Sequence, residues 1–285
     1  MKRAITLLLA AILLMVLMGC NRIPGTSIPV ETEVPYAFDY ERLWTFDPGQ
    51  PGFARTGAGH QITWNNEDVN LAWGKTPREF VVGGNNNFEK RVEKGVTYYF
   101  KESEITWDGT DANQKWISGM NFTRSIHFEQ DDYRYGLSAS ASRQNASLEA
   151  VSIETALELT VHPGLLVPGY GKTTEGWSTS FQNSNISLSI TISPPPFDQQ
   201  EFDRYLAEDG SVSMTAEDGL QYISSGRERS AEDPMIVCLF ARTEIGTVSV
   251  RGGVPYLERN NVPADSLDFI TLDLVRAVTA WIRGG

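Results

Sequence analysis

The feature that most constrains the fold is a sequence pattern that occurs twice in the same order. Residues 64–73 resemble residues 181–190, at a separation of 117 positions. Such self-similarity predicts a repeated structural unit. Chance similarity between strands is the alternative, but shared Pro and Gly positions favour duplication. The further matched pairs are Thr76-Pro77 with Ser193-Pro194, Phe80 with Phe197, residues 95–98 with 219–222, and residues 147–154 with 266–273.

Alternating apolar residues predict a β-hairpin near the start of each unit. Ile62 and Trp64 alternate with polar residues, and Val69, Leu71 and Trp73 do so after an Asn-rich turn. Residues 178–181 and 186–192 repeat this pattern in the second unit. More strands are expected at residues 97–100, 116–128, 133–141, 220–224, 235–242 and 247–250.

A Pro-led helix is expected after the second hairpin, whereas Gly83-Gly84 and residues 85–87 weaken that expectation after the first hairpin. A closing helix is expected at the end of each unit. Residues 196–206 place Phe202, Tyr205 and Leu206 on one helical face. Near the C-terminus, an apolar face with helical spacing follows Asp265, which can cap the start of a helix. That apolar face consists of Leu267, Ile270, Leu274, Val278 and Trp281. Residues 147–161 also alternate as a strand would, and the repeat favours helix there.

These elements predict an α+β fold made of two tandem similar units, each an antiparallel sheet packed by helices. The order of hairpin, Pro-led helix, meander and closing helix resembles the PsbP-like domain over residues 53–282. That resemblance implies an accessory or assembly role without an active site. A β-sandwich is the alternative if residues 151–161 form a strand. The expected boundaries are 36–163 for the first unit, 164–176 for a linker and 177–285 for the second unit.

The N-terminus predicts export and lipid anchoring. Lys2 and Arg3 precede an uncharged apolar stretch that is too short to span a membrane, which is typical of a signal peptide over residues 1–19. Leu17-Met18-Gly19-Cys20 resembles the lipobox of bacterial lipoproteins, and this resemblance implies cleavage before Cys20 and diacylation of its thiol. Residues 20–35 are Pro-rich and polar and are expected to form a disordered tether. An ordinary signal peptide or an uncleaved anchor is the alternative.

The net charge and the cysteine content limit the partners and the disulfide bonds that can be expected. Removing Lys2 and Arg3 leaves 22 basic residues against 36 acidic ones, a net charge of −14. Nucleic acid is therefore not an expected partner, because its binding depends on neutralising phosphates. With Cys20 lipidated, Cys238 is the remaining cysteine, so no internal disulfide is expected. Its apolar surroundings predict a buried structural thiol.

No catalytic or metal-binding pattern emerges, and no cofactor is expected. His60, His127 and His162 lack zinc-ligand spacing. Gly169–Thr173 resembles the end of a phosphate loop but lacks its first glycine, and residues 108–113 lack the Gly and Glu positions of an EF-hand loop. Asp131-Asp132 is an adjacent acidic pair whose side chains would point apart on a strand.

Seven tryptophans could serve the core or a ligand. The apolar periodicity assigns Trp64, Trp73, Trp116 and Trp281 to the core. Trp44, Trp107 and Trp177 lie nearer predicted loops and are candidates for ligand contact. The leading hypothesis is a non-enzymatic lipoprotein on the extracytoplasmic face of the cell membrane that binds an envelope protein or glycan, with the groove between the units as a candidate site. A hydrolase acting on envelope polymers and a carbohydrate-binding module are the alternatives.

Overall fold

The computed structural model describes residues 38–81, 87–110, 116–143, 146–197, 199–207, 211–227, 235–254 and 264–284. The expected signal peptide, the lipidation site Cys20 and the expected tether lie outside these residues. Residues 107–118 are described by their backbone alone where they are described, so the predicted roles of the Trp107 and Trp116 side chains also fall outside the description.

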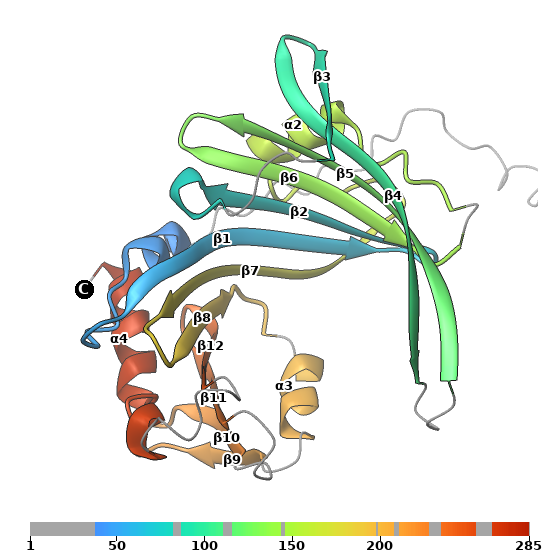
Figure 1. Cartoon of the computed structure of the whole chain (residues 1–285). Helices are drawn as coiled ribbons and strands as arrows, with labels where there is room; N and C mark the ends of the chain where they lie inside the picture. The colour runs from blue at the N-terminus through green and yellow to red at the C-terminus, as the bar shows by residue number, and fades with distance from the viewer. Residues whose placement is uncertain are drawn as a thin grey trace, which may run out of the picture. The chain divides into compact units, whose positions relative to one another are not determined.

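The described part of the chain forms one antiparallel sheet of twelve strands, in the order β3-β4-β5-β6-β2-β1-β7-β8-β12-β11-β10-β9 (Figure 1). The strands are β1 (Ala54–Asn65), β2 (Val69–Pro77), β3 (Glu89–Glu93), β4 (Val96–Thr110), β5 (Trp116–Gln130), β6 (Tyr133–Ala141), β7 (Gly171–Gln182), β8 (Ser187–Ser193), β9 (Ser211–Thr215), β10 (Gln221–Arg227), β11 (Met235–Thr243) and β12 (Gly246–Val254). The helical elements are η1 (Tyr40–Thr45), η2 (Arg78–Phe80), α2 (Ile153–Val161), α3 (Gln199–Leu206), η4 (Ala264–Leu267) and α4 (Leu272–Arg283).

The predicted α+β class with a separate sheet in each unit is wrong: the fold is β-rich and its sheet is continuous. β1 and β7 pair antiparallel in the middle of the sheet, and β7 begins at Gly171, inside the expected linker. Two separate six-stranded sheets would each leave the backbone groups of an edge strand unpaired. Pairing β1 with β7 satisfies both edges, which explains why one sheet forms. The β-sandwich alternative required a strand at residues 151–161, and α2 occupies that segment instead.

The strand order is nevertheless the same in the two halves of the sheet. The first half runs β1-β2-β6-β5-β4-β3 and the second runs β7-β8-β12-β11-β10-β9. The hairpins have equivalent registers, with His60 opposite Lys75 and Trp177 opposite Ile192, each 117 positions apart. The structural repeat thus coincides with the sequence repeat. Descent from a duplicated ancestor stays a prediction.

The pairing of β1 with β7 carries a further mark of the repeat. The register of this pairing shifts at two β-bulges, where Thr56 of β1 and Thr173 of β7 have no partner residue on the opposite strand. These bulged positions are also 117 residues apart. His60 and Trp177 are both direct partners and repeat equivalents, so a local pseudo-two-fold axis passes between them. We call the pairing of β1 with β7 the seam.

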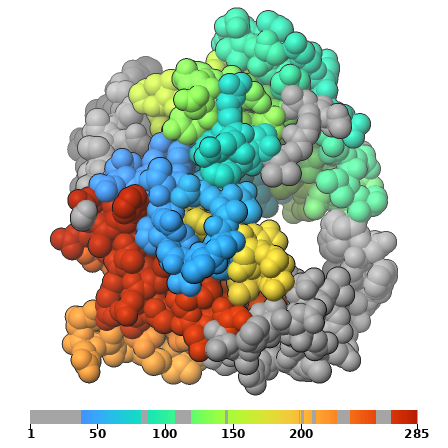
Figure 2. Space-filling view, turned by 60° about the vertical axis from the view of Figure 1, so that its left-hand side comes forward, coloured from blue at the N-terminus to red at the C-terminus, as the bar shows by residue number. Residues whose placement is uncertain are grey.

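Two helices and η1 pack on one side of the sheet, which we call the helical face and which includes the β1 side chains Ala58, Ile62 and Trp64. α2 packs over the first half and α4 over the second. η1 lies beside α4, where the blue and red segments meet in Figure 2. α3 packs on the opposite side, because Phe202 contacts Phe240 while the neighbouring Leu239 faces the core beneath α4.

Three expected helices are found with altered boundaries, while the segment after the first hairpin holds the short 3-10 helix η2. The Pro-led helix is α3, and residues 153–161 form a helix whose N-cap, Ser152, accepts a hydrogen bond from the backbone of Thr155. The C-terminal helix begins at Leu272, later than expected, because Leu267 and Ile270 precede it and pack over Gly252. The core role expected for Trp281 is wrong: its side chain is 39% exposed and its indole N–H donates to the carbonyl of Arg42.

Candidate functional site

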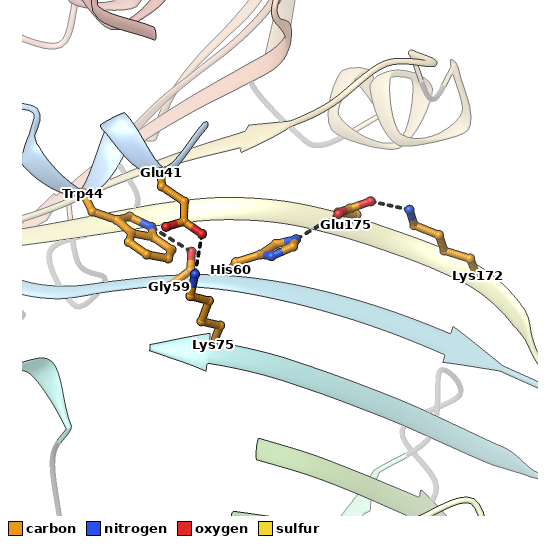
Figure 3. Close-up of polar contacts among 7 residues, drawn as sticks. All are labelled: Glu41, Trp44, Gly59, His60, Lys75, Lys172 and Glu175. Carbon is orange, nitrogen blue, oxygen red and sulfur yellow. Dashed lines mark hydrogen bonds and ion pairs between the residues drawn. The ribbon is translucent and has the colours of Figure 1, made fainter. Parts of the chain in front are cut away.

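The seam holds a polar cluster beneath the helical face (Figure 3). Nε2 of His60 lies 2.8 Å from Oε1 of Glu175, and Lys172 forms an ion pair with the other carboxylate oxygen. His60 and Glu175 are both buried. A buried carboxylate requires such partners, because its desolvation is costly when it is unpaired. The His60–Glu175 hydrogen bond therefore joins the two halves of the sheet in addition to the backbone pairing, whereas the ion pair of Lys172 with Glu175 lies within β7.

Aromatic rings enclose this pair. The His60 ring stacks on Trp177, with centroids 3.9 Å apart and planes within 8°, and meets Trp73 edge-on at 5.4 Å. Trp177 belongs to the core of the second half and Trp73 to that of the first. His60 thus bridges the two cores at the pseudo-two-fold axis.

η1 covers the same region from the helical side. Tyr40 stacks on Trp177 at 4.7 Å and donates its hydroxyl to the carbonyl of Ile245. Burial, with a smaller contribution from the negative charge of Glu175, raises the pKa of Tyr40 to about 12. Trp44 donates to the carbonyl of Gly59, and Lys75 pairs with Glu41 at 2.6 Å (Figure 3). These contacts close the cluster off on this side.

The His60–Glu175 pair resembles the histidine–carboxylate part of a catalytic triad, but its surroundings do not fit that chemistry. Both groups are buried, and the imidazole face is covered by Trp177. A general base must reach the proton it removes from a substrate. We therefore interpret the pair as structural.

The side of the sheet opposite the helical face carries mainly small polar residues. We call the side chains that point there from β6 to β12 the polar face. Among the described residues of this face, none is acidic and none is an apolar residue larger than alanine. They include Arg134, Gly136, Ser138, Ser140, Asn70, Ala72, Gly74, Thr76, Gly57, Gly59, Gln61, Thr63, Thr174, Gly176, Ser178, Ser180, Gln182, Ser187, Ser189, Thr191, Ser193, Thr247, Ser249, Arg251 and Gly253.

This face is hollowed along the seam. Three adjoining hollows of about 520, 440 and 440 Å³ open on it, the largest over β1, β2 and β6. The exposed side of an antiparallel sheet is normally polar, so polarity alone indicates only solvent contact. The choice of glycine and serine is more informative, because both are poor strand formers compared with threonine or a β-branched apolar residue.

Several glycines of the polar face are not required by packing. A Cβ atom at Gly74 or Gly136 would make only ordinary contacts, 3.7 Å from the carbonyl oxygen of His60 and 3.9 Å from that of Ile126. Neither backbone lies in the left-handed region. By contrast, a Cβ at Gly252 on the helical face would collide with Ile270. Glycine within a strand often marks close approach of a ligand, which makes the polar face the candidate functional site.

The first half also supplies an aromatic group beside this face. His127 on β5 lies opposite Gly136, and its ring stacks on Tyr99 at 5.1 Å and meets Phe88 edge-on at 4.5 Å. Burial, reinforced by the positive charge of Arg134, lowers the pKa of His127 to about 4. His127 is therefore neutral at pH 7 and adds no positive charge to this region.

The remaining predicted residues do not assemble into a site. Trp44 and Trp177, considered for ligand contact, are buried, and Trp64 and Trp73 are buried in the core as predicted. His162 is exposed at the end of α2, and Asp131-Asp132 occupies the exposed turn after β5. Gly171 begins a strand, and a phosphate loop would require a helix there.

Cys238 on β11 differs from its prediction as well. Its side chain is only partly buried. It lies between Val237 and Leu239, and Leu239 points into the core beneath α4. Because successive side chains of a strand alternate between faces, the Cys238 thiol points to the side of the sheet away from that core.

Ionisable groups give little support to a metal or acid–base centre. No group of three or more potential metal ligands occurs among the residues that the structure describes. The pKa values of Glu89, Glu129, Glu154 and Asp218 are each lowered, chiefly by a hydrogen-bonding basic side chain for the first three and by the backbone of Leu220 for Asp218. A general acid would need the opposite shift.

The sequence reasoning missed Lys172, Glu175 and the whole polar face. Its signal lay in the polar halves of the alternating strands, which hold Ser and Gly where charged residues would suffice for solubility. No helix in the described part of the chain is long and apolar enough to cross a membrane. The chain matches no protein-family model, no curated protein and no solved structure.

Proposed function

We propose that the chain is a lipid-anchored, extracytoplasmic binding protein of the cell envelope whose ligand lies on the polar face. The open glycines of this face carry the proposal. Glycine in a strand costs about 0.5–1 kcal/mol relative to alanine, and at Gly74 and Gly136 no contact within the described fold compensates for that cost. A surface kept clear of side chains for a ligand would explain these glycines.

The anchor is supported by the basic n-region, the apolar stretch and the Leu17-Met18-Gly19-Cys20 lipobox. Two acyl chains on Cys20 would give stable attachment, since one chain alone binds a membrane only marginally. In a strain that produces the chain, Cys20→Ala should move it from the membrane fraction to the soluble fraction. A variant that remains in the membrane fraction would contradict the lipid anchor.

A bulky substitution on the polar face tests whether this face binds the ligand. Gly74→Trp projects an indole into the largest hollow of the polar face, whereas Val161→Trp adds the same bulk on α2, at a site that is already 70% exposed. The retention of each full-length variant on the polysaccharide fraction of the host envelope is compared with that of the unsubstituted chain. We expect Gly74→Trp to lose retention and Val161→Trp to keep it. Equal retention of all three proteins would overturn the proposed face.

A further inference from the structure

The charge of the polar face is opposite to that of the chain as a whole. The sequence has 36 acidic and 24 basic residues. From β6 to β12, however, the charged side chains that the structure places on the polar face are Arg134 and Arg251. The face therefore offers positive charge within an acidic protein.

The two arginines are not neutralised equally. Arg134 donates to Glu129 on the neighbouring strand β5, at 3.2 Å, but the same carboxylate also accepts from Arg78 at 2.5 Å. One carboxylate thus serves two guanidinium groups. Arg251 is exposed, and no ion pair joins it to any residue that the structure describes. Arg251 thus offers a ligand a positive charge with no ion-pair partner among the described residues, whereas an anion at Arg134 would share that guanidinium group with Glu129.

Small hydroxyl-bearing residues connect the two arginines. The strand registers, together with the closeness of Thr76 to Gly59, place six residues in one row across the sheet: Arg134, Thr76, Gly59, Ser178, Thr191 and Ser249. Arg251 lies two residues farther along β12, on the same face. Five interstrand spacings give the row a length of about 24 Å. This length suits several units of an extended polymer better than a single small molecule.

The chemistry of the row indicates the ligand. Guanidinium groups bind carboxylates and phosphates through paired hydrogen bonds. Ser and Thr hydroxyls both donate and accept hydrogen bonds, which suits the hydroxyl groups of sugars. On the basis of the proposed function, we propose that the ligand of the polar face is an acidic glycan, with its anionic groups on Arg134 and Arg251 and its hydroxyl groups over the row between them.

The test uses a matched pair of probes, hexagalacturonate and its fully methyl-esterified form, which differ in charge but share the sugar chain. Binding to the full-length lipidated chain in detergent is measured by calorimetry. We expect the acid to bind at least about tenfold more tightly than the ester, because a charged hydrogen bond contributes that much or more. The preference for the acid over the ester should decrease as the salt concentration is raised, because salt screens the charges.

Substitutions of the two arginines test whether they cause the preference for the acidic probe. Arg134→Gln with Arg251→Gln should remove the preference for the acid, and Arg251→Gln alone should weaken it. The single variant alters an exposed side chain, so it keeps the test valid if the double variant does not fold. Equal affinity for acid and ester, with Gly74→Trp abolishing both, would overturn the acidic ligand but leave the proposed face intact. If Gly74→Trp left the binding of both probes unchanged, the proposed face itself would fail.

Discussion

Adding a single methyl group at chosen glycines distinguishes an open sheet face from a packed one. Gly74→Ala and Gly136→Ala place a Cβ on the polar face, where the nearest atoms are backbone oxygens at 3.7 and 3.9 Å. Gly252→Ala places the same group on the helical face, against Ile270 and 3.2 Å from Leu267. The chemical change is identical, and the surroundings differ.

The expected effects have opposite signs. Gly74→Ala and Gly136→Ala should each raise the free energy of unfolding by about 0.5–1 kcal/mol. Alanine restricts the conformations of the unfolded chain and introduces no clash in the folded one. For a domain of this size that increase corresponds to a rise in Tm of about 1–4 °C. Gly252→Ala should lower the free energy of unfolding by about 1–3 kcal/mol, because overpacking a core usually destabilises a protein by this amount.

Urea unfolding of the full chain, followed by tryptophan fluorescence, measures these differences. Gly59→Ala and Gly176→Ala serve as intermediate cases, since their Cβ atoms would lie 3.2 and 3.3 Å from the carbonyl oxygens of Lys75 and Ile192. If Gly74→Ala and Gly136→Ala destabilised the protein as Gly252→Ala does, the polar face would be filled in the folded chain. The reasoning from open glycines would then be refuted.

Three further predictions concern the seam and its surroundings. Glu175→Ala should lower the free energy of unfolding in urea by about 1–3 kcal/mol, because it leaves Nε2 of the buried His60 without its hydrogen-bond partner, whereas Lys172 is exposed enough to be solvated. A loss below about 0.5 kcal/mol would show that the pair contributes little. His127 should titrate in NMR with a pKa near its expected value of about 4. Because the unfolded chain binds that proton more readily, His127 should lower stability as pH falls from about 6.5 toward 4, and His127→Gln should show a smaller loss in this window. Trp281→Phe removes an exposed indole that donates to Arg42, and it should cost about 0.5–1.5 kcal/mol, whereas a loss typical of a core tryptophan would contradict its exposed position.

Local patterns predicted much of the secondary structure. The alternation of Val69, Leu71 and Trp73 predicted β2, and helical spacing with a Pro-led start predicted α3. For residues 151–161 the repeat decided correctly between two periodicities, since α2 and α4 begin at equivalent positions, Ile153 and Leu272. Boundaries were less accurate because tertiary contacts set them, as Leu267 and Ile270 show by packing over Gly252 instead of extending α4.

The architecture was not predictable from these local patterns. Gly169, Tyr170 and Gly171 indicate a linker by composition, yet Gly171 begins β7 because the free edge of β1 offers backbone partners. Trp44 and Trp177 lie near sequence breaks, but η1 folds back across the seam and buries both. The polar cluster depends on that same long-range pairing, which brings His60 to Glu175 across 115 positions.

Cysteine labelling tests the central claim, that the polar face along the seam is an open binding surface. Ser178→Cys places a thiol in the middle of the row, and Val161→Cys places one on α2, away from it. Maleimide labelling of each full-length variant is followed by peptide mass spectrometry, without and with saturating hexagalacturonate. We predict that both thiols react freely without the glycan and that the glycan slows only the thiol at position 178. A thiol at position 178 that fails to react, or that reacts equally fast in both conditions, would contradict the account.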